Sequence, residues 1–144
     1  MKSYRILILA LSIFAIGFSS CKKDADTSFA NSVSATIDGI GYYSDSIVSI
    51  GSAEIMNFTS AVGKEKIILY ISSAATTGSH ALNNNTYNIL YFNKNGIIYM
   101  PKSGNINISS YDVASKVIKG SFSATLNNGS ANAAITNGAF QIKY

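Results

Sequence analysis

Apolar and polar residues alternate with a period of two along most of the chain from Val33 to Tyr144. In the clearest stretch, the even-numbered residues from Ile118 to Leu126 are apolar or glycine, and the odd-numbered residues from Lys119 to Thr125 are polar. Successive side chains of a β-strand point to opposite faces, so the pattern predicts strands that are buried on one face. Because no stretch after residue 20 has helical periodicity, we expect residues 33–144 to form one all-β domain.

Turn residues separate the alternating stretches. Asp38-Gly39, Asn95-Gly96, Asn128-Gly129 and Asn137-Gly138 can each adopt positive φ at low cost, which tight hairpins require. The spacing of these turns predicts nine or ten short antiparallel strands. We therefore expect a single antiparallel β-sandwich, with a partly closed β-barrel as the alternative.

Three segments depart from simple alternation. Lys66–Ile71 is apolar on both sides, which is typical of a central strand that is covered on both faces. Pro101 lacks a backbone N–H, so we expect it to end a strand or to lie on an edge strand. The polar segment from Ala74 to Asn85 predicts a long loop.

The first 20 residues are typical of an export signal. Lys2 and Arg5 are positively charged, and the apolar stretch Ile6–Phe18 follows them. A membrane-spanning helix needs about 20 apolar residues, so this shorter stretch indicates the apolar core of a cleaved signal peptide. Small residues then lead to Cys21, the only cysteine of the chain.

Phe18-Ser19-Ser20-Cys21 resembles the lipobox of bacterial lipoproteins, with Phe18 where leucine is commoner. The resemblance implies that Cys21 is acylated with fatty acids such as palmitate and becomes the first residue of the mature protein. Residues 21–32 are polar and unpatterned, which predicts a flexible tether. The charged start of this tether resembles that of Bacteroidota lipoproteins, which implies the outer membrane and the cell surface.

The mature chain has a low net charge. Without Lys2 and Arg5, nine lysines, no arginine and seven acidic residues remain, so the net charge is +2. No basic stripe and no arginine are left to bind phosphate or bases, which argues against a nucleic-acid partner.

Few residues are suited to catalysis or to metal binding. His80, the only histidine, lies in a polar stretch and would be the base of a hydrolase, a less favoured alternative. A lipid-modified Cys21 leaves no thiol for a nucleophile or a zinc site. The glutamates Glu54 and Glu65 and the scattered aspartates form no recognisable pair, and Asp38 and Asp112 suit turns better. We therefore expect no catalytic residues, no metal and no cofactor.

Tyrosines are the best candidates for contact with a ligand. The chain has nine, of which three cluster around one predicted hairpin and two are adjacent, so that in a strand one of the adjacent pair must face away from the core. Exposed tyrosines can stack on sugars or anchor a protein partner, whereas buried tyrosines would fill the core. The candidate ligand contacts are Tyr42, Tyr43, Tyr87, Tyr91 and Tyr99. In addition, Asp45-Ser46-Ile47 resembles the acceptor sequence for O-glycosylation in Bacteroidota, which makes Ser46 a candidate glycosylation site.

The C-terminal half resembles a family of small Bacteroidota lipoprotein domains of unknown function. The resemblance rests on Gly120-Ser121-Phe122 and, after a hairpin, on Ile135-Thr136-Asn137-Gly138-Ala139-Phe140. Ala35-Thr36-Ile37-Asp38-Gly39 is similar to the start of that family. The resemblance implies a β-sandwich-like surface lipoprotein and no particular activity.

The sequence thus predicts a lipid-anchored, non-catalytic envelope protein with an interaction or structural role at the outer membrane. The alternative is a module that binds a carbohydrate or another ligand through exposed tyrosines. The expected partners are the membrane, through the lipid on Cys21, and an unidentified glycan or protein.

Overall fold

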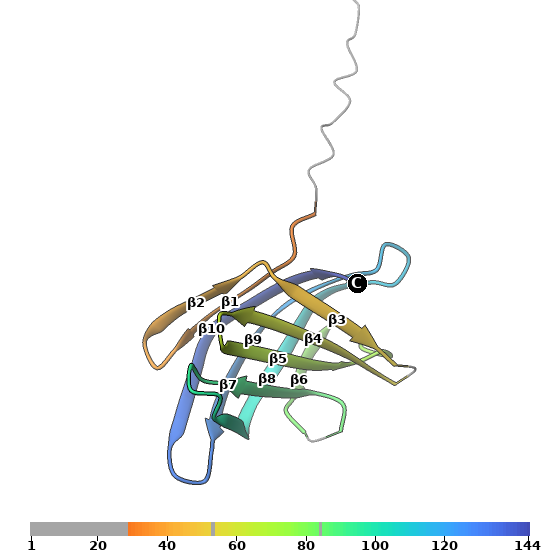
Figure 1. The fold of residues 1–144 in the computed structure, drawn as a ribbon. Helices are drawn as coiled ribbons and strands as arrows, with labels where there is room; N and C mark the ends of the chain where they lie inside the picture. The colour runs from red at the N-terminus through yellow and green to blue at the C-terminus, as the bar shows by residue number, and fades with distance from the viewer. Residues whose placement is uncertain (1–28, 53, 84) are drawn as a thin grey trace, which may run out of the picture.

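A computed structural model describes residues 29–52, 54–83 and 85–144, and these residues form antiparallel strands and no helix (Figure 1). The strands are β1 (Ser32–Ile37), β2 (Ile40–Ser44), β3 (Ile47–Gly51), β4 (Ile55–Val62), β5 (Glu65–Ser72), β6 (Gly78–Ala81), β7 (Asn88–Phe92), β8 (Ile98–Asp112), β9 (Val117–Asn127) and β10 (Asn132–Lys143). The predicted signal peptide, Cys21 and the tether up to residue 28 lie outside the described residues. No helix that could cross a membrane occurs in the described part.

All ten strands belong to one sheet, in the order β2-β1-β10-β9-β8-β7-β5-β4-β3, with β6 paired to β8. The two end strands, β2 and β3, are joined directly through Asp45 and Ser46. Side chains of β2 also reach β4: Ser44 Oγ donates to the Ala61 carbonyl over 2.9 Å, and Tyr42 Oη lies 3.0 Å from Ser60 Oγ. The sheet therefore curls into a nearly closed barrel.

The long strand β8 forms one corner of this barrel. Its first residues pair with β7 through Ile98 and Tyr99, and from Met100 onward it pairs with β9. The register shifts between Pro101 and Ser103, where the strand turns from one part of the sheet into the other. We call β3, β4, β5, β7 and the start of β8 the first half of the barrel, and the remaining strands the second half. Figure 1 shows the strands of the two halves crossing each other.

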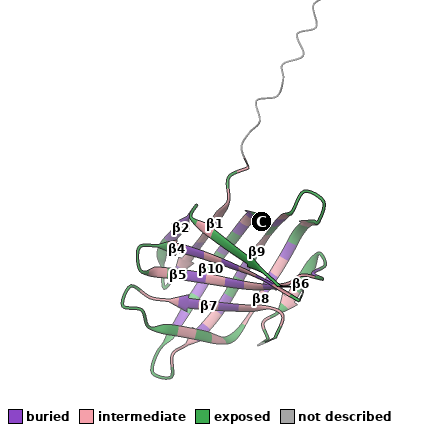
Figure 2. Ribbon diagram, turned by 45° about the vertical axis from the view of Figure 1, so that its right-hand side comes forward, coloured by how far each residue is buried: buried purple, intermediate pink, exposed green. Residues whose placement is uncertain are grey.

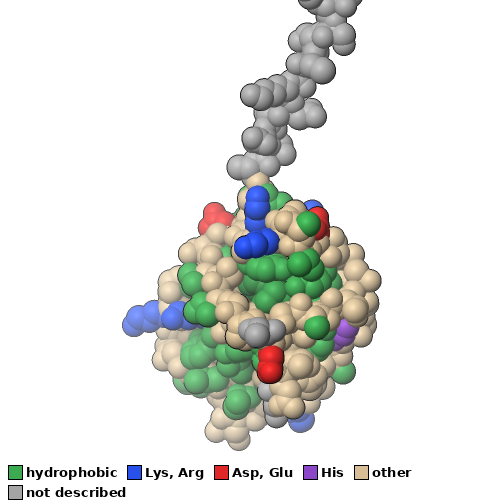
Figure 3. All heavy atoms as spheres, turned by 90° about the vertical axis from the view of Figure 1, so that its right-hand side faces the viewer, with side chains coloured by type: hydrophobic (Ala, Val, Ile, Leu, Met, Phe, Trp, Pro, Cys, Tyr) green, Lys and Arg blue, Asp and Glu red, His purple; other side chains and the backbone are tan. Residues whose placement is uncertain are grey.

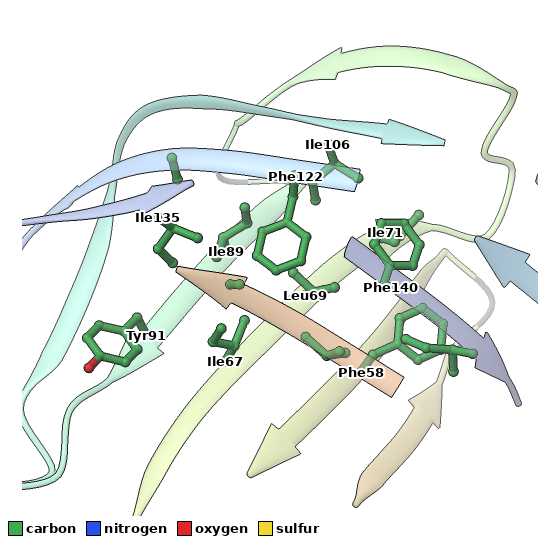
Figure 4. Packing of buried hydrophobic residues seen from close by; sticks show 14 of the residues in the cluster. Phe58, Ile67, Leu69, Ile71, Ile89, Tyr91, Ile106, Phe122, Ile135 and Phe140 are labelled. Atoms are coloured by element: carbon green, nitrogen blue, oxygen red, sulfur yellow. The ribbon is translucent and has the colours of Figure 1, made fainter. Parts of the chain in front are cut away.

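Alternating side chains from both halves fill the barrel. Burial alternates along the strands, as the colours in Figure 2 show, and β5 buries Ile67, Leu69 and Ile71 while its other residues stay partly or fully exposed. In Figure 4 these β5 residues face Phe122 and other residues of the second half across the core. The core is therefore a continuous apolar cluster shared by both halves.

Two glycines of the second half lie beneath phenylalanine rings. Gly120 pairs with Phe140, and Gly138 pairs with Phe122. A Cβ at Gly120 would fall 2.6 Å from Phe140 Cζ, and a Cβ at Gly138 would fall 2.6 Å from Phe122 Cδ2. Each ring occupies the space that the opposite glycine leaves free, which gives the Gly-Ser-Phe and Asn-Gly-Ala-Phe segments a packing role.

The prediction of an all-β antiparallel domain is confirmed, and of the two architectures the partly closed barrel fits best. Positive φ occurs at the hairpin turns of Asp38-Gly39 and at Gly96 and Gly129, as predicted. Asn137-Gly138 is different, because it lies inside β10, where the register shifts between Ile135 and Gly138. The positive φ of Asn137 thus serves a β-bulge and not a hairpin.

Two further expectations need correction in part. Pro101 does not end a strand, because it sits inside β8 at the register shift with β9. It does lie at a local edge, since β7 pairs with β8 only up to Tyr99 and β6 only from Asn105, and a missing N–H is tolerated there. The segment from Ala74 to Asn85 is not entirely a loop, since β6 pairs with β8 within it. The polar residues of β6 hid this strand, because its side chains contribute little to the core.

Candidate functional site

A hollow of about 210 Å³ opens at the end of the barrel where the β1–β2, β4–β5 and β7–β8 turns come together. We call it the mouth hollow. Both halves of the barrel contribute to its wall, which combines aromatic, acidic, basic and amide side chains. Its principal polar and aromatic residues are Asp38, Tyr42, Glu65, Tyr91, Lys94 and Asn95.

Tyr91 and Glu65 form the wall from the first half. Tyr91 is the last inward-facing residue of β7, and its hydroxyl donates a hydrogen bond to Glu65 Oε1 at the start of β5. Figure 4 shows Tyr91 at the margin of the core, with its hydroxyl turned away from Ile67 and Leu69. Burial raises the pKa of Tyr91 above its ordinary value, and the contact with Glu65 raises it further. The phenol is therefore a neutral donor at physiological pH.

Tyr42 approaches the hollow from the second half. It is 5 % exposed, and its hydroxyl lies 3.0 Å from Ser60 Oγ, which in turn donates to the Ile67 carbonyl over 3.0 Å. Burial raises the pKa of Tyr42 above its ordinary value, so this phenol is also neutral. The chain of hydrogen bonds fixes the ring against β4 and leaves its edge at the wall of the hollow.

Asp38 occupies the tip of the β1–β2 hairpin with a φ of 49°. Its N–H donates to the Ala134 carbonyl over 2.9 Å, and its Oδ1 accepts the Ala134 N–H over 2.8 Å. These two bonds to β10 hold the carboxylate at the rim of the hollow. The position of Asp38 in a turn was predicted, whereas its place beside Tyr91 and Glu65 was not.

The five candidate tyrosines do not form one exposed row. Tyr42 and Tyr91 line the mouth hollow, and the Tyr99 ring lies behind Tyr91 with the ring centroids 5.7 Å apart. Tyr43 is 62 % exposed on the outer surface of β2, because neighbouring residues of a strand face opposite sides. Tyr87 is half-buried and stacks on the His80 ring at 4.2 Å, away from the hollow.

His80 has contacts that do not resemble a catalytic arrangement. Its Nε2 lies 2.8 Å from the Thr76 carbonyl oxygen, and its ring stacks on Tyr87. The neighbouring Ser79 Oγ accepts a hydrogen bond from Asn105 Nδ2 over 3.0 Å. Within the described ranges, no group of three or more histidine, cysteine, aspartate or glutamate residues is placed to hold a metal ion.

The two candidate modification sites differ in what the structure describes. Ser46 is exposed in the link between β2 and β3, and its carbonyl oxygen accepts a hydrogen bond from Ser44 Oγ over 3.2 Å. Cys21 lies outside the described residues. The described end of the tether lies against β10, since Asn31 exchanges hydrogen bonds with the Lys143 backbone and Gln141 Nε2 donates to the Ala30 carbonyl.

The sequence reasoning missed the charged part of the hollow. Glu65, Lys94 and Asn95 lie in or beside turns that are far apart in the chain. In the sequence, the one available signal was that these three residues lie at or beside strand ends. Only the structure shows that these strand ends meet at the same end of the barrel. A second and larger hollow of about 690 Å³ lies on the outside of β7 and β8, beside Leu90, Ile98 and Met100, and it is mainly apolar.

Comparison of the chain with protein-family models, curated proteins and solved structures gives no match. The resemblance to Bacteroidota lipoprotein domains therefore rests on the motifs quoted above. In chemical terms, the mouth hollow offers carboxylate and amide oxygens, a lysine, two neutral phenols and an apolar floor. Such a set suits the binding of a small polar molecule that carries hydroxyl or amino groups.

Proposed function

We propose that the chain is a lipid-anchored, non-catalytic domain of the bacterial outer membrane with an interaction role. The observation that carries this proposal is Cys21, which follows a positively charged start, a short apolar stretch and two small residues. Two or three acyl chains would hold the domain firmly, because a single chain binds only reversibly.

The position of the tether agrees with this proposal. Residues 29–31 leave the barrel beside β10, and eight residues separate Phe29 from the end of the signal. An extended chain of eight residues spans at most about 29 Å. The barrel would therefore stay within about one domain diameter of the membrane, with its surface open to partners.

Replacement of Cys21 tests the anchor. We expect Cys21→Ala to move the protein from the membrane fraction to the soluble fraction, while intact mass shows the acyl chains on the wild-type protein alone. Ser20→Ala serves as the control, because a small residue before the cysteine is kept. Membrane retention of Cys21→Ala, or an unmodified Cys21 in the wild-type protein, would contradict the proposal.

The mouth hollow supports a second candidate function, the binding of a carbohydrate. Two of the predicted ligand contacts, Tyr42 and Tyr91, line this hollow together with the carboxylates of Asp38 and Glu65. Carboxylates accept hydrogen bonds from sugar hydroxyls. Tyr42 and Tyr91 are 5 % and 6 % exposed, so they support the wall of the hollow and offer a sugar little ring surface for stacking.

A panel of mono- and disaccharides, titrated while amide NMR shifts are recorded, tests this second candidate. We expect shifts at residues of the hollow that Glu65→Gln removes and that Glu54→Gln, an exposed residue in the β3–β4 turn, leaves in place. Binding that is equal in both variants would place the ligand elsewhere.

Ser46 remains a proposed glycosylation site, and its exposure is compatible with access by an enzyme. Mass spectrometry of the protein from its native envelope would detect a glycan on the Asp45–Ile47 peptide. An unmodified peptide would contradict this assignment.

A further inference from the structure

The outside of the first half is mainly apolar along a row of paired residues, in which Thr59 is the one polar member. Val48, Thr59, Ile68 and Leu90 are paired one to the next across β3, β4, β5 and β7. The parallel row contains Ile50, Asn57, Tyr70 and Asn88, so it alternates apolar or aromatic residues with amides. We call these two rows, with Ile98 and Met100 of β8, the apolar outer face.

The corresponding row of the second half has a different character. Ser34, Ala139, Ser121, Asn107 and Ser79 are paired across β1, β10, β9, β8 and β6. These five members are small or polar, and the row ends on β2 at Tyr43, which pairs with Ser34 and is 62 % exposed. The apolar outer face is therefore a property of one half and not of the whole barrel.

Several apolar side chains of the face are strongly exposed. Val48 is 58 % exposed, Ile50 is 66 % and Met100 is 58 %. Hydrophobic side chains also gather in contiguous areas on the side of the molecule that Figure 3 presents. Large contiguous apolar areas on a soluble surface mark interaction sites more often than chance exposure does.

The sequence of β5 points to a covered face. Lys66–Ile71 has the continuous apolar pattern of a strand that is buried on both sides. Inside the barrel, Ile67, Leu69 and Ile71 are fully buried, whereas Ile68 and Tyr70 on the other side are only half-buried. In a single copy of the chain, the outward-facing side chains of β5 therefore have no layer packed over them.

We propose that the apolar outer face is an interface between two copies of this chain, packed sheet against sheet. A two-fold axis would place apolar residues of each copy opposite those of the other. The rows contain no charged residue, and the lysines Lys66 and Lys102 stand at the margin of the face. A symmetric pair would therefore bring no like charges together at its centre.

The place of the tether favours a second copy over the lipid bilayer. Phe29, Ala30 and Asn31 contact Lys119, Gln141 and Lys143, which belong to β9 and β10 of the second half. This step rests on the proposed lipid anchor: the tether attaches to the second half, so the anchored side of the barrel is the polar one and not the apolar outer face. Strands lie about 4.8 Å apart, so five strands give a face about 19 Å wide. Rows on one face lie about 7 Å apart along the strands, so two rows of this width cover a few hundred Å², below the roughly 800 Å² per partner of a stable interface, and a concentration-dependent dimer is expected.

Cysteine cross-linking of the full-length protein in its own membrane tests the proposal. Cys21 is the only native cysteine, so a Thr59→Cys variant presents one thiol at the centre of the face. With a short bis-maleimide we expect a cross-linked band at twice the mass of the chain. The matched control is Ser121→Cys, at the centre of the polar row, which should give at least about ten-fold less dimer, equivalent to 1.4 kcal/mol.

A second substitution separates an interface from accidental collision. In the Thr59→Cys background, Ile68→Lys should reduce the dimer at least about ten-fold, because a lysine would be buried without a partner. Ser121→Lys should leave the dimer unchanged, and thermal unfolding of both variants checks that they are folded. Equal cross-linking from Thr59→Cys and Ser121→Cys, or a product with a mass other than two chains, would overturn the proposal. Cross-linking of the wild-type chain would instead reveal a free Cys21 and contradict the lipid anchor alone.

Discussion

The two halves of the barrel have equivalent inner faces and different outer faces. Leu69 on β5 and Leu126 on β9 are both completely buried. On the outside, Ile68 and Tyr70 of β5 contrast with Ser121 and Ser123 of β9. Strand pairing and core packing alone would allow either outer face, so the barrel fold does not explain the difference, which we attribute to the proposed interface.

The outer face of the second half is also internally hydrogen-bonded. Asn105 accepts a hydrogen bond from Ser123 Oγ over 3.0 Å and donates one to Ser79 Oγ over 3.0 Å. These polar side chains connect β6, β8 and β9 on the surface. On the first half, Thr59 and Asn57 make a longer contact of 3.5 Å, and most of the neighbouring side chains are apolar.

The largest loss of stability is expected from shortening side chains in the core, where the two halves are equivalent. Leu69→Ala and Leu126→Ala should each lower the free energy of unfolding by about 2–5 kcal/mol, because both remove completely buried side chains and leave cavities. Denaturant titration of the isolated variants measures this loss. A small cost in one half and a large cost in the other would show that the halves do not share one core.

A smaller loss of stability is expected when a methyl group is added in the closely packed second half, and none when it is added on β3 at the end of the sheet. Gly120→Ala places a methyl group against the Phe140 ring and the Asn107 carbonyl, so we expect a loss of about 1–3 kcal/mol. Gly51→Ala on β3 is the matched control, because no atom lies within 4 Å of the added Cβ. Similar melting temperatures for the two variants would mean that the Gly120–Phe140 pair can relax without cost.

The contact that joins the halves at β2 and β4 should contribute less. Tyr42→Phe removes the hydrogen bond between Tyr42 and Ser60, for which we expect a loss of about 0.5–1.5 kcal/mol. Tyr43→Phe, on the exposed side of the same strand, should have almost no effect. If both variants unfold alike, the hydroxyl of Tyr42 does not help to close the barrel.

The smallest effect on the free energy of unfolding is expected at alkaline pH. Burial raises the pKa of Tyr144 to about 12, and burial also raises the pKa of Tyr91. A phenol whose pKa is raised in the folded state stabilises the fold fully at pH values below its ordinary pKa of 10.0. This stabilisation is lost as the pH rises from there toward the pKa of the folded state. The free energy of unfolding should therefore fall between pH 10 and pH 12, and less steeply in Tyr91→Phe than in the wild-type protein. Denaturant titrations across this range measure the slope, and a flat profile would contradict the stated cause.

The second half was the easier half to predict. Its strands alternate clearly, because their outer residues such as Ser121 and Lys119 are polar. The first half was predicted less completely. The continuous run of β5 predicted a central strand covered on both faces: its pairing with β4 and β7 confirms the central position, whereas the cover on the outer side is wrong for this barrel, since Ile68 and Tyr70 are only half-buried. Periodicity fails in this case, because it cannot distinguish a covered apolar face from an exposed one.

The mouth hollow was predictable only in part. Tyr42 was selected because it is adjacent to Tyr43, and Tyr91 because it belongs to a cluster of tyrosines around one hairpin; the structure places both in the lining of the hollow. Glu65 and Lys94 gave no signal, since a charged residue beside a turn is ordinary. Their proximity depends on the closure of the barrel, which brings together turns that are distant along the chain.

By itself, the sequence determined most of the strands, most of their turns and most of the residues that face the core, because these follow from a period of two and from the φ preferences of glycine, asparagine and aspartate. The tertiary structure alone decided that Asp45 and Ser46 join the two ends of the sheet, and that Phe122 and Phe140 cover each other's glycines. The physical reason is that local patterns act over a few residues, whereas closure depends on register and twist summed over the whole sheet.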